Sequence, residues 1–383
     1  MARIVLASYL IRFPMGGYQS WILQWLLGFR QLGHDVYFVE KAAWENACFD
    51  PNTGQSSDDP SAGIRVVSDL LERFGLAGKW CFVERSGRHH GLSRSRVQEV
   101  FRSADVFIDN VQHCEWWEEA QACQRRVLVD GEPGYRQIRM EKALASGATD
   151  AFPTFDFHFT VGRNVGTSSS SAPTAGRTWH PVFDPVVPEL FRTAPPPLDA
   201  AWTTVTSWQV HQELEHNGVV YGQKDMEFER FMDLPQRVDA PVELAIAGRR
   251  VPRARLESAG WRLRDAHSVT RTLDDWRTYI AGSRGEFSVA KNVFVATNSG
   301  FFSDRSAAYL ASGRPVVMQD TGFSAHLPCG DGLFAVTNVE EAAEAINRIT
   351  ADYDHHSRAA RAIACEHLDA AKVLPAFLST IGL

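Results

Sequence analysis

Residues 4–39 read IVLASYLIRFPMGGYQSWILQWLLGFRQLGHDVYFV, and this stretch decides the fold class. It begins with a short apolar run of the kind found in buried parallel strands. After a loop that contains Gly16 and Gly17, apolar residues recur at helical spacing over 18–32, and Gly33 stands where a glycine commonly follows a helix. The closing VYFV predicts a second strand. Strand, glycine turn, helix and strand form a βαβ unit, in which ligands approach the carboxyl ends of the strands.

The alternation of strand and helix continues through the first half of the chain. The local pattern predicts strands that end at Asp109 and at Asp130, a helix over 116–125, and a polar loop over 45–63. Stretches rich in Pro, Ser and Gly interrupt this pattern before residue 200, which is typical of a boundary between domains.

The alternation restarts at residue 202 and includes apolar strands over 242–247 and 333–336 and a helix over 303–312. A chain of 383 residues has room for two domains of about 100–200 residues each. We therefore predict an α/β fold of two Rossmann-like, doubly wound domains that face each other across a cleft. The predicted divisions are 1–195, 196–365 and a C-terminal helix, 366–383, with the first domain as its packing surface.

The composition limits the classes of function. Apolar residues make up 44% of the chain and charged residues 22%, an ordinary mixture for a globular protein. The net charge of −7 argues against general nucleic-acid binding, which needs a basic surplus. The six cysteines form no Cys-x-x-Cys pair, so we expect reduced thiols and a cytoplasmic protein. No stretch approaches the roughly 18 apolar residues of a transmembrane helix, and the first residues predict a strand rather than a signal peptide.

A second segment carries a family resemblance. Residues 298–317 read NSGFFSDRSAAYLASGRPVV. This segment resembles the donor-nucleotide segment of the GT-B glycosyltransferases, nucleotide-sugar-dependent enzymes of the family 1 and family 4 type. In that segment a glycine-containing loop opens a helix rich in small residues, and Gly-x-Pro-Val-Val begins the next strand. The loop at Gly16 and Gly17 looks like the glycine loop of the first domain in the same superfamily, and Gly33-His34-Asp35-Val36 resembles its Gly-His-x-Val strand entry.

The resemblance implies both fold and function. It implies a GT-B fold, with an acceptor-side first domain and a second domain that binds a nucleotide-diphosphate sugar. It further implies a hexosyl- or related transferase that moves the sugar to a hydroxyl or other nucleophile of an unidentified acceptor. The nucleotide sugar is then a co-substrate, and we expect no separate cofactor. We also expect a metal-independent enzyme, because no Asp-x-Asp motif ends a predicted strand.

The donor site is expected around the start of the helix at 303–312. Ser303 is placed to cap this helix, whose free N–H groups and dipole favour a diphosphate. Arg305 adds a charge-assisted clamp, and Asp304 accepts from ribose hydroxyls. By the resemblance, Lys224 reaches the diphosphate. The predicted donor-binding residues are Gly16, Gly17, Trp208, Lys224, Glu286, Lys291, Ser299, Gly300, Phe301, Ser303, Asp304, Arg305 and Ser306.

Catalysis by inversion needs a base for the acceptor hydroxyl, and carboxylates at strand ends of the first domain suit this role. We rank Asp130 and Glu132 first, followed by Asp109 and His113. The stereochemical outcome stays open, because the pair of glutamates seven residues apart that many retaining enzymes carry is absent; Ala308 stands at one of the two positions.

Other interpretations remain. A GT-B fold also suits a nucleotide-sugar epimerase or hydrolase, and the missing glutamates leave room for a non-catalytic nucleotide-sugar-binding protein. The absence of Gly-x-Gly-x-x-Gly after the first strand argues strongly against a nucleotide-cofactor oxidoreductase. The sequence leaves open the donor base, the sugar, the acceptor and the oligomeric state.

Overall fold

The first of two sheets contains eight strands. The computed structural model describes residues 1–110, 114–148 and 152–383. Within these ranges the strand order is β10-β9-β8-β7-β1-β2-β5-β6, and all neighbours are parallel apart from the antiparallel pair β5–β6. The strands are β1 Arg3–Ala7, β2 Asp35–Lys41, β5 Trp80–Val83, β6 His89–Gly91, β7 Val106–Asp109, β8 Arg126–Asp130, β9 Phe157–Thr160 and β10 Trp179–Pro181.

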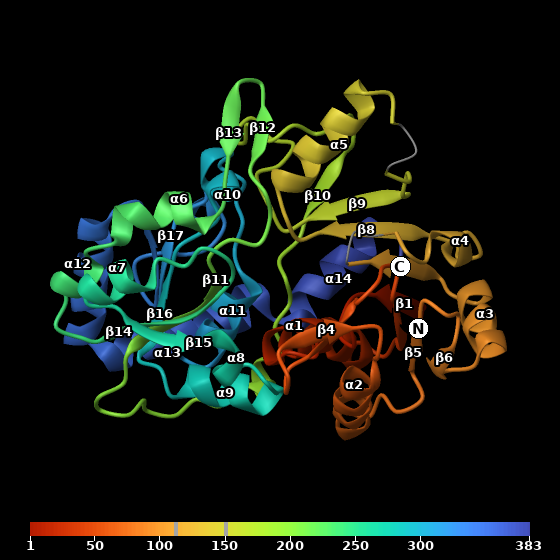
Figure 1. Ribbon diagram of the computed structural model, residues 1–383, viewed down its shortest axis with the longest axis horizontal. Helices are drawn as coiled ribbons and strands as arrows, with labels where there is room; N and C mark the ends of the chain where they lie inside the picture. The colour runs from red at the N-terminus through yellow and green to blue at the C-terminus, as the bar shows by residue number, and fades with distance from the viewer. Residues whose placement is uncertain (111–113, 149–151) are drawn as a thin grey trace.

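The second sheet contains six parallel strands in the order β15-β14-β11-β16-β17-β18, and it lies on the opposite side of the molecule (Figure 1). The strands are β11 Trp202–Ser207, β14 Val242–Ala247, β15 Arg262–Asp265, β16 Gly285–Ser288, β17 Val316–Gln319 and β18 Leu333–Val336. Two short hairpins project from the domains: β3 Cys48–Asp50 with β4 Gln55–Ser57, and β12 Leu214–His216 with β13 Val219–Tyr221.

Helices cover both faces of each sheet. In the first domain these are α1 Gly16–Gln31, α2 Ser61–Arg73, α3 Arg94–Arg102, α4 Trp117–Ala120 and α5 Tyr135–Ala145. The second domain contributes α6 Lys224–Phe228, α7 Arg253–Ser258, α8 Ala266–Val269, α9 Leu273–Ala281, α10 Asn292–Ala296, α11 Asp304–Ala311, α12 Val339–Ala351 and α13 Tyr353–Ile363. The chain ends with a π-helix, η6 Ala364–Leu368, and α14 Ala370–Thr380. Short 3₁₀ turns are η2 Pro188–Leu190, η3 Glu229–Phe231, η4 Leu234–Gln236 and η5 Phe323–Ala325.

The alternation of side chains along a strand explains why helices cover both faces of the first sheet. Ile4 and Leu6 of β1 point into a core that contains α1 and α14, whereas Val5 and Ala7 belong to a separate core with α3 and α4. Successive residues of a strand face opposite sides of the sheet, so a continuous apolar run requires helices on both. The predicted doubly wound architecture is therefore present in this domain.

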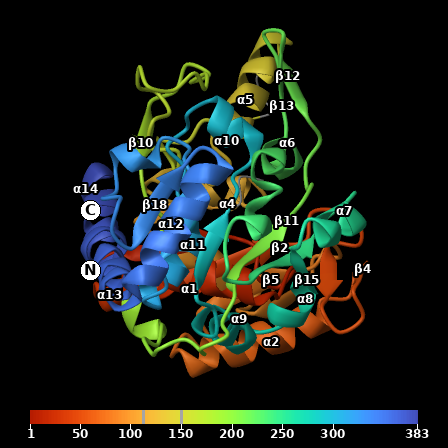
Figure 2. The same ribbon diagram turned by 90° about the vertical axis from the view of Figure 1, so that its left-hand side faces the viewer.

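The C-terminal helix α14 packs against α1 of the first domain, as both views show (Figures 1 and 2). The ring of Phe377 lies 5.7 Å from Trp25 and 6.1 Å from Phe29. Gly28 permits this close approach, because a Cβ there would lie 2.6 Å from Leu374 Cδ1. None of the described helices has the length and apolar character needed to cross a membrane.

The chain crosses between the domains twice. It leaves the first sheet at Pro181 and enters the second at Trp202, so the predicted division at residue 195 lies within this connection. The return passes through α13 and η6, where Val186 and Asp369 form a bridge between the two crossings. Away from these crossings the domains also meet where α1 packs against α9, and Gly16 N at the start of α1 donates to Thr270 O, just after α8, over 2.6 Å.

Candidate active site

A cavity of about 1200 Å³ lies between the two domains. Its walls include the loop after β1 and the start of α1 from the first domain, and the carboxyl ends of β11 and β16 with the start of α11 from the second. Sites for small molecules occupy about 300–1,000 Å³. This cavity therefore has room for a nucleotide and for part of a second substrate.

The predicted site residues divide into those that line this cavity and those that do not. The lining residues among them are Gly17, Glu132, Lys224, Lys291, Phe301, Ser303, Asp304 and Arg305. The described residues that lie elsewhere are Gly16, Asp109, Asp130, Trp208, Glu286, Ser299, Gly300 and Ser306. His113 lies outside the described residues.

Helix α11 presents its N-terminus to the cavity. Ser303 is its N-cap, and the Ser303 hydroxyl accepts from Arg305 N over 3.3 Å. The preceding loop is held by the first domain: Asn164 N donates to Ser299 O over 2.9 Å, and Gly162 forms a bridge with Phe301. The helix start is therefore fixed by contacts from both domains.

The loop before α11 requires a glycine at position 300, and replacement of Gly300 tests the contact between this loop and the first domain. Gly300 has φ +75°, and a Cβ there would lie 2.8 Å from Asn164 N. We expect Gly300→Ala to lower the free energy of unfolding by about 2–4 kcal/mol, from backbone strain and from this clash. The control is Gly218→Ala, because Gly218 has φ +76° with open space around the position of a Cβ. Urea denaturation measures both, and an equal loss would show that the contact with Asn164 does not matter.

Arg305 is held in place by three acceptors. Its Nε donates to the Glu286 carboxylate, its Nη1 to Val205 O over 3.1 Å, and its Nη2 to Ser288 Oγ over 2.5 Å. Glu286 has no exposed side-chain surface and does not line the cavity. It therefore positions Arg305 from behind, where the sequence had suggested that it contacts a ligand.

Lys224 and Lys291 add positive charge near Arg305. Lys224 Nζ donates to Thr206 Oγ1 over 2.7 Å. Burial, followed by repulsion from Arg305 and Lys291, holds the pKa of Lys224 well below its usual range. Among the described residues, six Lys and Arg side chains line the cavity against three carboxylates, Glu132, Asp184 and Asp304, and this excess of basic groups favours an anionic ligand.

Lys291 forms an ion pair across the cleft. Its Nζ lies 2.5 Å and 2.6 Å from the two carboxylate oxygens of Glu132, which belongs to the loop after β8. Burial acts to raise the pKa of Glu132, but Lys291 and His211 outweigh it and bring this pKa to about 2. In this arrangement Glu132 is an ionised partner for a cation and a poor acceptor of protons.

Asp130 and Asp109 do not line the cavity, and each accepts hydrogen bonds from neighbouring groups of the first domain. Asp130 is fully buried and accepts from Gln137 Nε2 over 2.8 Å and from Thr160 Oγ1 over 2.9 Å. It also accepts from Glu132 N over 3.0 Å, so it shapes the turn that carries Glu132 to the cavity. Asp109 is buried and accepts from Cys114 N over 3.0 Å.

Asp184 is a site residue that the sequence analysis did not identify. It follows β10, and its Oδ1 accepts from Trp21 Nε1 over 2.7 Å and from Trp25 Nε1 over 3.1 Å. Burial, with the charge of Asp304 second, raises the pKa of Asp184 to about 7. Burial likewise raises the pKa of Asp304. A carboxylate soon after a strand was the available signal, but the strand β10 before Asp184 was itself not predicted.

Aromatic rings form the wall beside Asp184. The ring of Tyr9 lies 5.9 Å from Phe13, 5.0 Å from Tyr18 and 6.0 Å from Trp21. All four line the cavity. Such flat apolar surfaces, with hydroxyl and indole groups at their edges, suit a sugar or another ring-bearing molecule.

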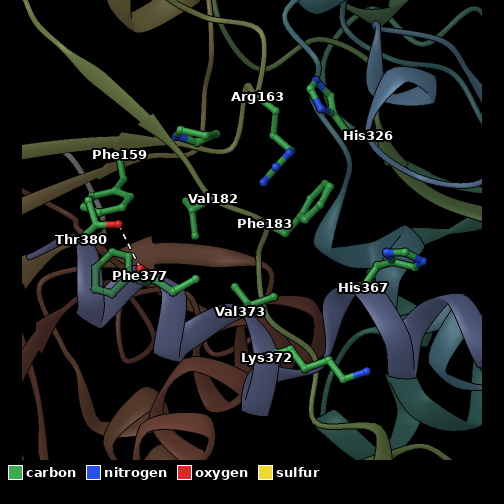
Figure 3. Close-up of a pocket in the computed structure, with 12 residues that line it drawn as sticks. Phe159, Arg163, Val182, Phe183, His326, His367, Lys372, Val373, Phe377 and Thr380 are labelled. Carbon is green, nitrogen blue, oxygen red and sulfur yellow. Dashed lines mark hydrogen bonds between the residues drawn. The ribbon is translucent and has the colours of Figure 1, made fainter. Parts of the chain in front are cut away.

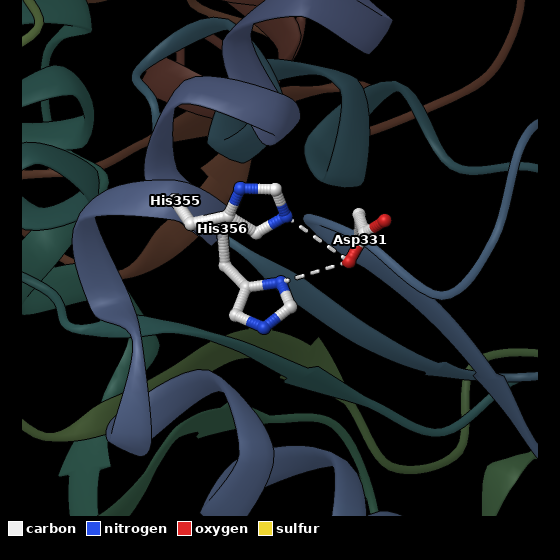
Figure 4. A group of neighbouring side chains, drawn as sticks. All are labelled: Asp331, His355 and His356. Carbon is white, nitrogen blue, oxygen red and sulfur yellow. Dashed lines mark ion pairs between the residues drawn. The ribbon is translucent and has the colours of Figure 1, made fainter.

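A possible metal site lies apart from the cavity. Within the described ranges, Asp331, His355 and His356 are the one group of His, Cys, Asp or Glu side chains with ligand atoms close enough to share an ion (Figure 4). None of the three lines the cavity. Gly332 N donates to His356 Nδ1 over 3.2 Å, and Arg348 lies 3.4 Å from Asp331. These contacts occupy ligand atoms that a metal ion would need.

Known proteins resemble the chain in structure only. No family model and no curated protein sequence matches it. One similar structure is Anabaena HepE in complex with UDP-glucose, with TM-score 0.59 and 12% identity over 100% of this chain and 99% of that chain. Another is an alpha-glucosyltransferase in complex with UDP and a 13-mer DNA containing a central A:G mismatch, with TM-score 0.57 and 12% identity over 99% and 98%.

A third similar structure is sucrose-phosphate synthase from Thermosynechococcus elongatus, with TM-score 0.54 and 11% identity over 100% of this chain and 99% of that chain. These proteins are GT-B glycosyltransferases. Likeness at this level of identity concerns the fold. The predicted fold, two Rossmann-like domains in the GT-B arrangement, is confirmed.

Proposed function

We propose that this protein transfers a glycosyl group from a nucleoside-diphosphate sugar to a nucleophilic group of an acceptor. One observation carries the proposal: Lys224, Lys291 and Arg305 converge with the N-terminus of α11 on one cavity between two domains. A diphosphate gains there from free backbone N–H groups, from the helix dipole and from the excess of positive charge.

A UDP-sugar is the donor that we favour. HepE and the alpha-glucosyltransferase were solved with UDP-glucose or UDP, and their fold is the fold of this chain. In the proposed complex the diphosphate lies against Ser303, Lys224 and Arg305, and Asp304 accepts from a donor hydroxyl. The aromatic wall at Tyr9, Tyr18 and Trp21 faces the remaining space, where the acceptor is expected to bind.

The proposed reaction breaks the bond between the anomeric carbon and the diphosphate oxygen. The electron pair of this bond goes to the departing diphosphate, whose charge the three cations and α11 stabilise. A new bond forms between the anomeric carbon and the acceptor oxygen. We propose that Asp184 takes the proton of that oxygen, because a base with a pKa near 7 is suited to proton transfer at neutral pH.

Glu132, which the sequence ranked among the first candidates for the base, has a different role in this proposal. Both its oxygens lie against Lys291 Nζ, and its pKa of about 2 makes it a weak base. A bound diphosphate competes with Glu132 for Lys291. The ion pair therefore holds Lys291 in the cavity until the donor arrives.

We propose that the reaction needs neither a resident metal nor a cofactor, because side chains of the protein supply the positive charge around the leaving group. Activity that is unchanged by EDTA is the expected result. The six cysteines are all free thiols, which supports the cytoplasmic location that the sequence predicts.

The donor is tested by a thermal-shift screen against UDP, GDP, ADP, CMP, dTDP and their common sugar conjugates. We expect UDP and its conjugates to raise the Tm, because a ligand that binds the folded state stabilises it. An absence of any shift would remove the support for a nucleotide site. Sugar release with and without candidate acceptors then separates a transferase from an epimerase or hydrolase, which turns over the donor alone.

Lys224 is expected to make the binding of UDP depend on pH. Because its pKa is lowered in the free protein, a bound diphosphate restores the charged form, and binding takes up a proton at pH values above that pKa. We expect the UDP binding enthalpy to vary with the ionisation enthalpy of the buffer, and the affinity to fall as the pH rises. Lys224→Met removes the buffer dependence and weakens binding by about tenfold to a hundredfold.

Isothermal titration calorimetry measures both effects. The control is Lys79→Met, because Lys79 pairs with Asp35 on the first sheet and does not line the cavity. A buffer dependence that survives in Lys224→Met would assign the proton to another group.

A further inference from the structure

A second, smaller pocket of about 290 Å³ lies where the two chain crossings meet (Figure 3). One side is apolar and is formed by Phe159 and Phe377, with Val182 and Phe183 from the segment after β10. We call this site the hinge pocket. Of the described residues, none lines both the hinge pocket and the large cavity.

The polar side of the hinge pocket is basic. Arg163 comes from the loop after β9, His326 from the loop after η5, His367 from η6 and Lys372 from α14. Among the described residues that line the pocket, none carries a carboxylate. In a chain with a net charge of −7, a pocket with four basic side chains and no lining acid favours an anion.

Arg163 lacks the partners that an arginine in such a position normally has. Its guanidinium lies 4.3 Å above the ring of Phe183. Its Nε is buried without a hydrogen-bond partner, and no carboxylate of the described part of the chain forms an ion pair with it. Figure 3 shows the guanidinium directed into the pocket, between Val182 and Phe183. Arg163 as a whole is half-buried, and a partly desolvated charge without a partner favours an anion in the pocket.

The neighbouring basic groups suit a phosphate. Burial lowers the pKa of Arg163, and burial together with Arg163 lowers the pKa of His326. His326 Nε2 is in contact with Asn164 Oδ1 at 2.7 Å, which fixes the imidazole beside the pocket. A dianion between Arg163 and His326 would favour the charged form of each group.

We propose that the hinge pocket binds a phosphate monoester with a small apolar group, the phosphate on Arg163 and the apolar group against Phe159, Val182 and Phe377. The pocket is formed by both domains and by α14, and its lining includes residues of both crossings, Val182 and Phe183 from the first and His367 from the second. The segment 162–164 separates the hinge pocket from the large cavity. Arg163 of this segment lines the hinge pocket, and the backbone of the segment pairs with the loop 299–301.

Phenyl phosphate is the probe. Inorganic phosphate and phenol, which represent its two parts, are the comparison ligands, and binding is measured by isothermal titration calorimetry. Lys224→Met is used throughout beside the unchanged protein, because it weakens the anion site of the large cavity and leaves the hinge pocket intact. We expect phenyl phosphate to bind both proteins, inorganic phosphate to bind more weakly, and phenol not to bind. This test needs no nucleotide, so its result is independent of the proposed transfer reaction.

Arg163→Gln is expected to weaken the binding of phenyl phosphate about tenfold to a hundredfold, because the variant loses a charge-assisted contact. The variant is expected to fold, because it removes an unpaired charge. Lys372→Gln, on the exposed side of α14, is a second variant and should also weaken binding. Arg102→Gln removes the same charge from the exposed end of α3 and should change nothing.

Three results would overturn the proposal. They are an absence of phenyl phosphate binding, equal binding to Arg163→Gln and the unchanged protein, and equal affinity for phenyl phosphate and inorganic phosphate. The last result would mean that the apolar side contributes nothing and that the ligand class is wrong.

Discussion

Replacement of Arg305 by methionine is expected to lower the free energy of unfolding by about 3–5 kcal/mol, because it leaves a buried charge without its partner. Glu286 has no exposed side-chain surface, and Arg305 supplies its ion pair. The remaining partner is Thr204, whose Oγ1 lies 3.5 Å from Glu286 Oε1. A single neutral hydroxyl at that distance does not compensate a carboxylate in the interior.

The double variant Arg305→Met/Glu286→Gln should recover most of this loss, because it removes both charges together. The control is Arg255→Met, whose partner Glu229 is 51% exposed and whose own side chain is 57% exposed. An exposed pair contributes about 0–1 kcal/mol. Urea denaturation at pH 8 measures all three variants. A double variant as unstable as Arg305→Met would show that the loss comes from packing and not from the stranded charge.

Replacement of Asp184 by asparagine is expected to lower the transfer rate by about 10²–10⁴-fold, the usual contribution of a general base. The change preserves the shape of the side chain, and the amide oxygen can still accept from the indoles of Trp21 and Trp25. In the unchanged protein the rate should rise with pH through about 7, as Asp184 loses its proton. The measurement is UDP release from a UDP-sugar across pH, with the acceptor that the unchanged protein uses.

Asp184→Glu is the matched control, because it keeps a carboxylate and should retain the pH dependence that Asp184→Asn loses. A rise through pH 7 that persists in Asp184→Asn would assign the base to another group. A merely structural role for Asp184 would lower the rate equally at every pH.

Asp184 also makes stability depend on pH. Its carboxyl has an ordinary pKa of 3.8 and a raised pKa of about 7 in the folded protein. Between these values the folded state holds more protons than the unfolded state, so stability falls as the pH rises across this window. Asp184→Asn should therefore raise the Tm at pH 8, by about 2–4 °C for each kcal/mol of destabilisation removed, and give a smaller gain at pH 5, where only part of the loss has accumulated. Differential scanning calorimetry at the two pH values measures this, and an equal gain at both would exclude titration as its cause.

Elements with a clear apolar pattern were predicted at or near their bounds. The strands β14 Val242–Ala247 and β18 Leu333–Val336 match the predicted ranges, because short, fully buried strands are continuous apolar runs. The cap of α11 at Ser303 was also predicted, because capping depends on residues adjacent in the sequence.

Elements without such a pattern were missed or misjudged. Helix α5 was not predicted, because Arg136 and Gln137 are among its buried residues and interrupt the apolar stripe. The predicted helix at 116–125 is wrong in length: α4 covers Trp117–Ala120, and the chain after it forms turns, in which Ala122 N donates to Glu119 O and Cys123 N to Ala120 O, both over 3.0 Å. The predicted loop at 45–63 contains the hairpin β3–β4 and the start of α2.

The sequence by itself determined the α/β fold of two Rossmann-like domains, the strands with continuous apolar runs and the capped helix that faces the cavity, because these depend on hydrogen bonds and burial patterns among residues close in the chain. Tertiary structure alone decided how the charges are paired. Lys291 and Glu132 are 159 residues apart, and Trp21 and Asp184 are 163 residues apart. The pKa of each carboxylate follows from its burial and from the cation, indole or second carboxylate beside it. Local pattern does not encode those distances, and only the packing of the two domains fixes them.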